Sequence, residues 1–480
     1  MASKIQFGVF ELDRDAAELQ KQAVLIRLQE QPIPGSIGES RLRLETQHMK
    51  QHLAKTLSVL SPLAVLITAT ACGQGGTASP PPPLPISVAV SPKLVPAQTG
   101  TTLQFTANVS NSTNTNVTWE VNGKPGGDSA SGTISATGLY SAPAAVIDPP
   151  TVSVIAVSQA DNSKSDTATV GITPNVPTRD VWFAPDFASA DFPNLFTPPD
   201  QWTTARSRVK VFKFYAVQVN SSFVPCPDWL CGTTRLPQLV NVQAFSQLKA
   251  WGVDIGIEAG AVKPENCSGD PLVNVAVDAV QNVQANGGIV RFIAMDEPFI
   301  GGQLTANGQN CNFTMQQSAA QTAHFVETLQ GKFIYTVIGD IEPYPYFSVA
   351  QLEAWISLLH SLGVQLAFFH LDVDPALVAS TGADLAGDLQ ALNAFCQAQK
   401  IPFGVLLNSL TTTSDQMYYS DAIQFTQRVK SAIGKPQASI FQSFDCATGT
   451  CNTPINLPEN DPNIFSHTRL INDALAILNQ

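Results

Sequence analysis

Hydrophobic and polar positions follow different patterns in two parts of this chain. Between residues 86 and 173, short runs such as "ISVAVSP", "TLQFTANV" and "TVSVIAVS" alternate apolar and polar side chains, and turn residues separate them. Short alternating strands about ten residues apart are typical of an all-β sandwich. From about Arg179 on, eight longer apolar runs take their place, at residues 181–187, 209–217, 253–261, 289–298, 333–343, 364–374, 402–410 and 438–445.

Amphipathic helical patterns lie between most of these eight runs, and several of them end in glycine, as helices commonly do. They cover residues 240–252, 274–288, 316–331, 349–363 and 384–399. Alternation of strand and helix over this length predicts an α/β fold, a (β/α)8 TIM barrel over residues 178–480 that follows the sandwich in a multidomain chain. A doubly wound open sheet is the alternative, but no Gly-rich phosphate loop follows the first run.

An apolar stretch, Thr56–Ala71, is shorter than the roughly 20 residues of a membrane-spanning helix, and the cationic "MKQHLAK" precedes it. This layout predicts a signal peptide over residues 49–72. Its end, "ITATAC", resembles the lipobox of bacterial lipoproteins, although Ala69 replaces the usual leucine. The resemblance implies that Cys72 is lipidated and anchors the protein to a membrane. A buried helix with an ordinary cysteine is the alternative.

In lipoproteins retained at the inner membrane, an aspartate follows the lipidated cysteine, but here Gly73 follows Cys72. The resemblance therefore implies an extracytoplasmic protein of the outer membrane or cell surface. A periplasmic protein is the alternative. Residues 73–85 are Gly-rich and then Pro-rich, which predicts a linker that acts as a stalk. Residues 1–48 contain a stretch that resembles the opening strands of a winged-helix DNA-binding domain, but it stops before any recognition helix. We interpret it as an extension of the reading frame before Met49 or as a fusion remnant.

The motifs "QFTANV", "VTWEVNG" and "GTISATGLYSAP" follow one another in residues 86–174, in the order of bacterial Ig-like (Big) domains, and the segment resembles that family over its whole length. Members of this family are usually spacers or adhesive modules. Within such a sandwich Trp119 is expected to be a core aromatic. The resemblance therefore implies presentation of the following domain and supplies no chemistry.

Composition and charge indicate which partners and cofactors to expect. The chain has 480 residues, of which 44% are hydrophobic and 13% charged, and its formal net charge is −12. Nucleic-acid binders need a positive surface that displaces counterions from phosphate, so we expect no nucleic-acid partner. With six histidines and no His-x-His or His-Glu-x-x-His motif, we expect no catalytic metal and no cofactor. We expect a monomer.

Eight cysteines suit an oxidising compartment. The short loops "CPDWLC" (Cys226, Cys231) and "CATGTC" (Cys446, Cys451) each predict a local disulfide, and Cys267 and Cys311 are available for a third. Zinc binding by the two short loops is the alternative. Four residues separate the cysteines of each loop where a zinc knuckle has two, and no histidine is near, so zinc is disfavoured. One further cysteine, in residues 384–399, remains free.

Polar side chains gather where the eight predicted strands end. Catalytic residues of a barrel lie at the carboxyl ends of its strands, and buried carboxylates are costly unless they are paired or used. The pattern therefore predicts a site at this mouth. Its acids and polar groups are Asp186, Glu258, Asp296, Glu297, Asp340, Glu342, His370, Asp372, Asn408 and Gln442, and the aromatic residues Tyr215 and Tyr344 would suit stacking against a sugar.

Two of these acids stand in a repeated step. The sequences "MDEPF" and "DIEPY" align on their prolines, so Glu297 and Glu342 are expected at equivalent positions of adjacent strands. Two such carboxyl groups could come within the roughly 5 to 5.5 Å that retaining glycosidases use, or lie farther apart if their side chains diverge, with one as proton donor and the other attacking or steadying the anomeric carbon. We predict Glu297 and Glu342 as this pair, supported by Asp372. The alternative is that Glu-Pro is only a common composition of turns.

The adjacent acids Asp296 and Glu297 allow a different chemistry. Such a pair resembles that of hexosaminidase-like enzymes, in which the aspartate orients the acetamido group of the substrate and the glutamate is the acid. Alternatively, Asp296 points outward and caps a helix. The stretch "HLDVD" places His370, Asp372 and Asp374 on one strand face, which is also a geometry for a hard metal, although a supporting role for Asp372 is favoured.

Taken together, residues 179–480 resemble the glycoside hydrolase superfamily of (β/α)8 barrels, which implies hydrolysis of a polysaccharide or oligosaccharide. One departure is that the seventh strand ends in Asn408, where a large clan of these enzymes has its nucleophile. A non-catalytic carbohydrate-binding or adhesive surface lipoprotein is the alternative. Esterase and protease chemistry is disfavoured, because the chain has no Gly-x-Ser-x-Gly elbow and no Cys-His arrangement at strand ends.

Overall fold

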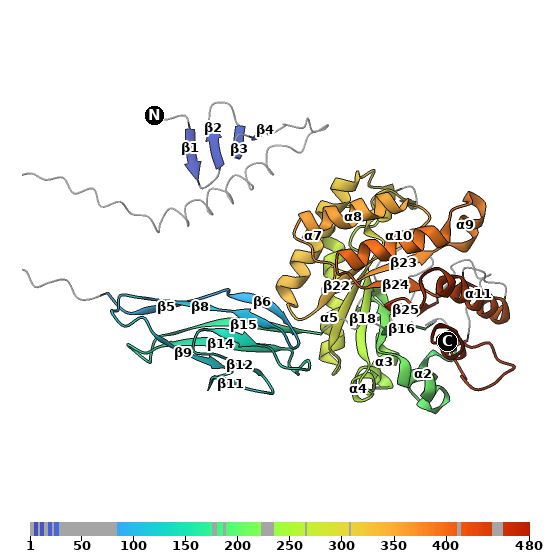
Figure 1. Cartoon of the computed structure of the whole chain (residues 1–480), viewed down its shortest axis with the longest axis horizontal. Coiled ribbons are helices and arrows are strands. Elements are labelled where there is room, and N and C mark those ends of the chain that lie inside the picture. Colours follow the sequence, from blue (N-terminus) through green and yellow to red (C-terminus); the bar gives the residue numbers. More distant parts are fainter. Residues whose placement is uncertain are drawn as a thin grey trace, which may run out of the picture. The chain divides into compact units, whose positions relative to one another are not determined.

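The computed structural model describes residues 84–174, 180–185, 189–221, 235–264, 266–306, 309–409, 414–443 and 455–480, together with four short strands near the N-terminus. The chain divides into two compact units, Met1–Pro81 and Pro82–Gln480 (Figure 1). In the first unit an antiparallel sheet has the strand order β1 (Lys4–Phe7), β2 (Phe10–Asp13), β3 (Glu18–Lys21) and β4 (Val24–Arg27). The predicted signal peptide, Cys72 and residues 73–83 of the linker lie outside the described residues.

Residues 87–173 are built from short β-strands in three sheets (Figure 1). Five strands pair in the order β10 (Lys124–Pro125), β9 (Val117–Val121), β14 (Thr151–Ser158), β15 (Ser165–Thr173) and β6 (Leu94–Gln98). Four pair in the order β11 (Gly127–Asp128), β12 (Gly132–Ile134), β13 (Leu139–Ser141) and β7 (Thr102–Gln104), and β5 (Ser87–Ser91) pairs with β8 (Thr106–Ser110).

Alternation along these strands builds a core between the sheets. In β14 every second residue is buried, as the sequence pattern predicts for a strand with one covered face. Trp119 is 6% exposed and lies in this core beside Phe105, with ring centroids 6.4 Å apart. Trp119 therefore has a structural role.

The second part of this unit is a closed barrel of eight parallel strands, which confirms the predicted barrel and excludes the open sheet (Figure 1). Each of the eight apolar runs overlaps one strand. In barrel order the strands are β16 (Asp180–Ala184), β17 (Val211–Tyr215), β18 (Asp254–Ala259), β19 (Val290–Asp296), β22 (Val337–Tyr344), β23 (Phe369–Val373), β24 (Phe403–Leu406) and β25 (Ala438–Gln442).

Helices surround the barrel, and each of the five helical patterns of the sequence overlaps one (Figure 1). Polar caps start several of them: Thr314 and Ser348 accept backbone N–H groups three residues on, in capping boxes. The helices are α2 (Thr203–Arg208), α3 (Leu236–Asn241), α4 (Ala244–Ala250), α5 (Asp270–Ala285), α6 (Pro298–Gly301), α7 (Met315–Lys332), α8 (Val349–Ser361), α9 (Pro375–Thr381), α10 (Leu385–Ala398), α11 (Asp415–Ile433) and α12 (His467–Leu478).

The direction of each strand side chain follows from two separate cores. The first fills the barrel interior and includes Trp182, Phe292, Ile341, Phe368 and Ile440. The second lies between the strands and the helices. Because successive side chains of a strand point to opposite faces, positions an even number of residues from an interior residue also point inward. Positions 258, 296, 372, 408 and 442 are therefore inward, whereas positions 340 and 342 face the helices.

The cysteines of the described residues agree with the prediction. Cys267 and Cys311 form a disulfide, and Cys396 is free and buried. The other four predicted partners lie outside the described residues: Cys226, Cys231, Cys446 and Cys451.

Candidate active site

A group of charged side chains meets inside the carboxyl end of the barrel, and we call Glu258, Asp296, Glu297, Asp372, Lys213 and Lys263 the mouth cluster. Burial, and then the charges of Glu258, Asp296 and Asp372, hold the pKa of the Tyr215 hydroxyl well above its usual range. Three acids from three different strands thus surround one buried phenol.

The deepest part of the mouth cluster is a buried ion pair. Lys213 of β17 has a side chain that is 0% exposed, and its Nζ donates to carboxylate Oε2 of Glu258 and to Oε1 of Gln442. Gln442 in turn donates through Nε2 to the Tyr215 hydroxyl at 2.7 Å. Burial raises the pKa of Glu258, and the charge of Lys213 opposes that rise. Glu258, Gln442 and Tyr215 were all expected at the mouth, but Lys213 was missed.

Asp296 points inward at the end of β19 and forms an ion pair with Lys263, with Oδ2 and Nζ 2.8 Å apart. The alternative that Asp296 points outward and caps a helix is therefore wrong. Lys263 belongs to the segment after β18, and its pKa is raised, because the attraction of Asp296 and Glu297 outweighs burial. Lys263 was also missed by the sequence reasoning, since it follows a strand end in a stretch without periodicity.

Glu297 follows Asp296 in a left-handed backbone conformation, with φ 51° and ψ 51°. This conformation is uncommon for residues other than glycine and is disfavoured before a proline such as Pro298. Its N–H donates to the carbonyl of Ile341 at 3.1 Å. Burial raises the pKa of the Glu297 carboxyl to about 8, Lys263 opposes this, and Asp296 and Asp372 add to it. Glu297 therefore carries a proton at neutral pH.

Asp372 and His370 both point inward from β23, as the sequence predicts. Burial and the charge of Glu258 raise the pKa of Asp372 to about 7, and Asn408 Nδ2 lies 3.4 Å from its Oδ1. His370 lies deeper, with its ring edge-on to Trp182 at a centroid distance of 4.9 Å, and burial holds its pKa well below the usual range. Its imidazole is neutral.

Asp374 does not join this face. Its Oδ1 accepts the N–H of Leu377 at 2.9 Å and caps α9. Within the residues that the structure describes, no group of three His, Cys, Asp or Glu side chains is suited to hold a metal ion.

Glu342 corrects the sequence prediction. The register is as expected, because Asp296 pairs with Ile341 and Glu297 is thereby level with Glu342. The Glu342 side chain, however, points to the helix layer, where Oε1 accepts the N–H of Phe299 at 2.7 Å. Glu342 therefore does not line the mouth as the partner acid of Glu297, because it lies on the opposite face of its strand.

Two other predicted binding residues of β22 share this outer position. Asp340 accepts the indole N–H of Trp355 on α8 at 2.8 Å, and the Tyr344 hydroxyl donates to Asp388 on α10. Neither reaches the mouth. Asp186 lies outside the described residues. At the rim beyond β22, Tyr346 is 52% exposed. Partial burial of its hydroxyl raises its pKa, and the charges of Asp374, Glu297 and Asp372 add to this.

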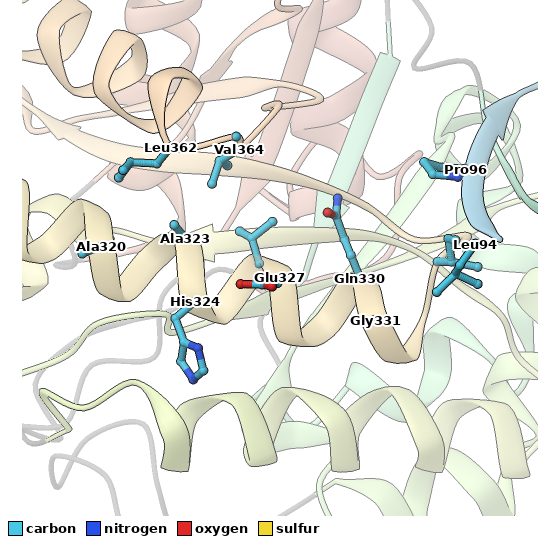
Figure 2. Close-up of a pocket in the computed structure, with 13 residues that line it drawn as sticks. Leu94, Pro96, Ala320, Ala323, His324, Glu327, Gln330, Gly331, Leu362 and Val364 are labelled. Carbon is cyan, nitrogen blue, oxygen red and sulfur yellow. The ribbon is translucent and has the colours of Figure 1, made fainter. Parts of the chain in front are cut away.

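One cavity lies away from the mouth cluster. A cavity of about 700 Å³ is lined largely by α7 and by the segment 362–364 that precedes β23, and Figure 2 shows His324, Glu327 and Gln330 on its helix wall. Because the segment before a barrel strand belongs to the end opposite the mouth, this cavity contains none of the mouth cluster. It is therefore separate from the candidate site.

The fold and the mouth cluster define a (β/α)8 barrel with an acid-rich carboxyl end. No protein-family model matches the chain, and no curated protein matches it. Among solved structures, a fungal β-1,4-galactanase has 14% identity and a TM-score of 0.40, with 61% of this chain and 99% of that chain covered. A chitinase domain from Pyrococcus furiosus has 11% identity and a TM-score of 0.37, over 63% and 97%. An endo-β-1,6-glucanase has 9% identity and a TM-score of 0.40, over 63% and 76%.

Proposed function

We propose that the barrel is a glycoside hydrolase in which Glu297 is the proton donor and Asp296 the stabilising carboxylate. The observation that carries the proposal is the contrast between two adjacent acids. Glu297 is protonated at neutral pH because its pKa is raised to about 8, whereas Asp296 is paired with the ammonium of Lys263 at 2.8 Å. Carboxyl groups held in opposite states by their surroundings are the usual acid and base of a glycosidase.

In this mechanism Glu297 gives its proton to the glycosidic oxygen as the bond between that oxygen and the anomeric carbon breaks. The carboxylate of Asp296 then steadies the positive charge that develops on the carbon, either directly or by orienting the acetamido group of a 2-acetamido sugar. Water completes the hydrolysis, and the deprotonated Glu297 recovers a proton from it. Asp372, with a pKa of about 7, accepts a hydrogen bond from a sugar hydroxyl. The exposed ring of Tyr346 stacks on a sugar face.

We also propose that residues 86–174 are a bacterial Ig-like domain and that Cys72 carries a lipid anchor, so that the barrel is presented as an extracytoplasmic, monomeric protein at the outer membrane or cell surface. The order of a signal-like segment, a Gly/Pro-rich stalk and a β-rich domain supports this arrangement. No helix among the described residues has both the length and the apolar composition that crossing a bilayer requires.

The test is turnover by the full chain on a panel of polysaccharides and aryl glycosides, with and without a 2-acetamido group. Glu297→Gln and Asp296→Asn should each lower kcat about 100-fold or more, because each removes a group that acts in the transition state. Glu327→Gln is the matched control, since Glu327 is an exposed carboxylate on α7. Full turnover in both variants would refute the assignment, and glycan binding without turnover by the wild type would favour the non-catalytic alternative.

A further inference from the structure

Glu342 is buried without a cation and has no place in the proposed reaction, yet its contacts lead directly to Glu297. Its side chain is 0% exposed, its Oε1 accepts the backbone N–H of Phe299 at 2.7 Å, and the backbone N–H of Ile300 also acts on the carboxyl, lowering its pKa. Both amides belong to α6, which begins one residue after Glu297. The carboxyl group therefore holds the segment that follows the proposed proton donor.

The turn that Glu342 supports is one that the backbone would not adopt unaided. Glu297 has a positive φ and precedes Pro298, and a residue in such a conformation costs on the order of 1–3 kcal/mol. Three hydrogen bonds hold it: Glu297 N–H to Ile341, Gly301 N–H to the Glu297 carbonyl at 2.8 Å, and Phe299 N–H to Glu342. Only the third comes from a side chain.

This turn decides where the Glu297 carboxyl goes. Asp296 points inward, so continued strand geometry would send the next side chain to the helix layer, where Glu342 lies. The left-handed residue breaks that alternation. The Glu297 carboxyl instead feels the charges of Lys263, Asp296 and Asp372, which all belong to the mouth.

The surroundings leave α6 little room to move. Phe299 stacks on Phe347 with centroids 3.8 Å apart and on Trp355 with centroids 4.9 Å apart. A Cβ added to Gly301 would collide with the carbonyl of Val262, in the segment that carries Lys263. Glu342 thus holds a tightly packed helix, α6, which begins next to Glu297 and ends against the segment of Lys263.

We propose that Glu342 is a positioning residue: by accepting the α6 amides it fixes the turn at Glu297 and directs the Glu297 carboxyl into the mouth. The inference rests on the proposed role of Glu297 as proton donor. It also explains why a second Glu-Pro step is present on the neighbouring strand although its carboxyl cannot reach a substrate. Because burial holds the pKa of Glu342 well above its usual range, it accepts these bonds as a neutral acid, which a glutamine can imitate.

The experiment compares Glu342→Gln, Glu342→Asp and Glu342→Met in the full chain with the wild type. Carbon-13 labelling of glutamate carboxyls gives the titration of Glu297 by NMR, and the signal that disappears in Glu297→Gln assigns it. Glu342→Gln should keep the Glu297 pKa near 8 and keep kcat. Glu342→Met should move the Glu297 titration to lower pH, because the carboxyl swings toward water, and should lower kcat about 100-fold with KM little changed.

Glu342→Asp, which withdraws the acceptor by one methylene, should lie between these two and tests the inference should the Met variant not fold. Leu389→Ala on α10 is the control for lost packing, because Leu389 is buried in the same layer and should lower stability without moving the Glu297 titration. An unchanged Glu297 titration in folded Met and Asp variants overturns the inference, as does a shift in Glu342→Gln. Because the titration needs no substrate, absence of turnover in the wild type would refute the proposed function alone.

Discussion

Lys263 Nζ lies 2.8 Å from Asp296 Oδ2, and this ion pair joins the segment after β18 to the end of β19. About a fifth of the Lys263 side chain and a quarter of the Asp296 side chain are exposed, so solvent screens the pair only in part. Lys263 also opposes the effect of burial on Glu297. One lysine therefore pairs with Asp296 and limits the rise of the Glu297 pKa that burial causes.

Replacement of Lys263 by methionine should shift the pH dependence of turnover. Without the ammonium the pKa of Glu297 rises above about 8, so the limb of the kcat profile that reports its proton loss moves to higher pH. The rate at neutral pH should fall about 10-fold or more, since Asp296 loses a charged partner. Lys332→Met, at an exposed site on α7, is the control. A profile that matches the wild type would contradict the role of Lys263.

The buried pair Lys213–Glu258 predicts a change in stability. Loss of one partner leaves an unpaired charge in the barrel interior, so Lys213→Met and Glu258→Gln should each lower the free energy of unfolding by about 3–5 kcal/mol. The double variant should recover much of this loss because it leaves no unpaired charge. Urea unfolding measures all three.

The exposed pair Lys124–Asp128 provides the matched control. Lys124→Met removes a similar ion pair where water solvates both groups, so it should change stability little. If Lys213→Met and Glu258→Gln lowered the free energy of unfolding as little as this control, water would have to solvate the Lys213–Glu258 pair. That outcome would contradict its burial.

The barrel could be predicted from the sequence because each strand is a long apolar run bounded by turns, and each intervening helix has its own period. The direction of the strand-end acids could not. In a parallel barrel both strand faces are buried, so the run "VIGDIEPY" of β22 contains no alternation from which to tell inward from outward. Alignment on the prolines gave the register of Glu342 correctly and its face wrongly.

Lys213 has a signature in the sequence that predicts its place in the mouth cluster. It stands within the apolar stretch "VKVFKFYAV", and a lysine inside a buried strand must be paired. Side chains two residues apart in a strand point to the same face, so Lys213 is expected on the same face as Tyr215, which the sequence predicts at the mouth. By contrast, the left-handed turn at Glu297 has no signature in the sequence, because a glutamate before proline predicts an extended residue.

Asp340 predicts how stability depends on pH. Burial raises its pKa to about 8, so between pH 4 and pH 8 the folded chain binds a proton there that the unfolded chain releases. Stability is therefore lost as pH rises through this range, by up to about 1.4 kcal/mol per pH unit for one proton. Asp340→Asn keeps an acceptor for Trp355 and removes this proton. The stability of Asp340→Asn relative to the wild type should grow from pH 5 to pH 8 in urea unfolding, and parallel curves would contradict the buried, protonated state.

The disulfide Cys267–Cys311 connects the segment of Lys263 to the segment after α6, and it predicts a coupled loss of stability and activity. Its cysteines are 44 residues apart, so the double variant Cys267→Ser/Cys311→Ser should lower the free energy of unfolding by about 4 kcal/mol through a less restricted unfolded chain. It should also lower kcat/KM, because Lys263 lies four residues before Cys267 and loses its tether.

These two effects separate in a double-mutant cycle with Lys263→Met. If the disulfide acts on turnover through Lys263, its removal in the Lys263→Met background should lower kcat/KM little further, whereas the loss of stability should remain nearly complete. Both are measured under oxidising conditions, so that other cysteines keep their state. Additive losses of kcat/KM would show that the disulfide supports the mouth by a route other than the Lys263–Asp296 pair.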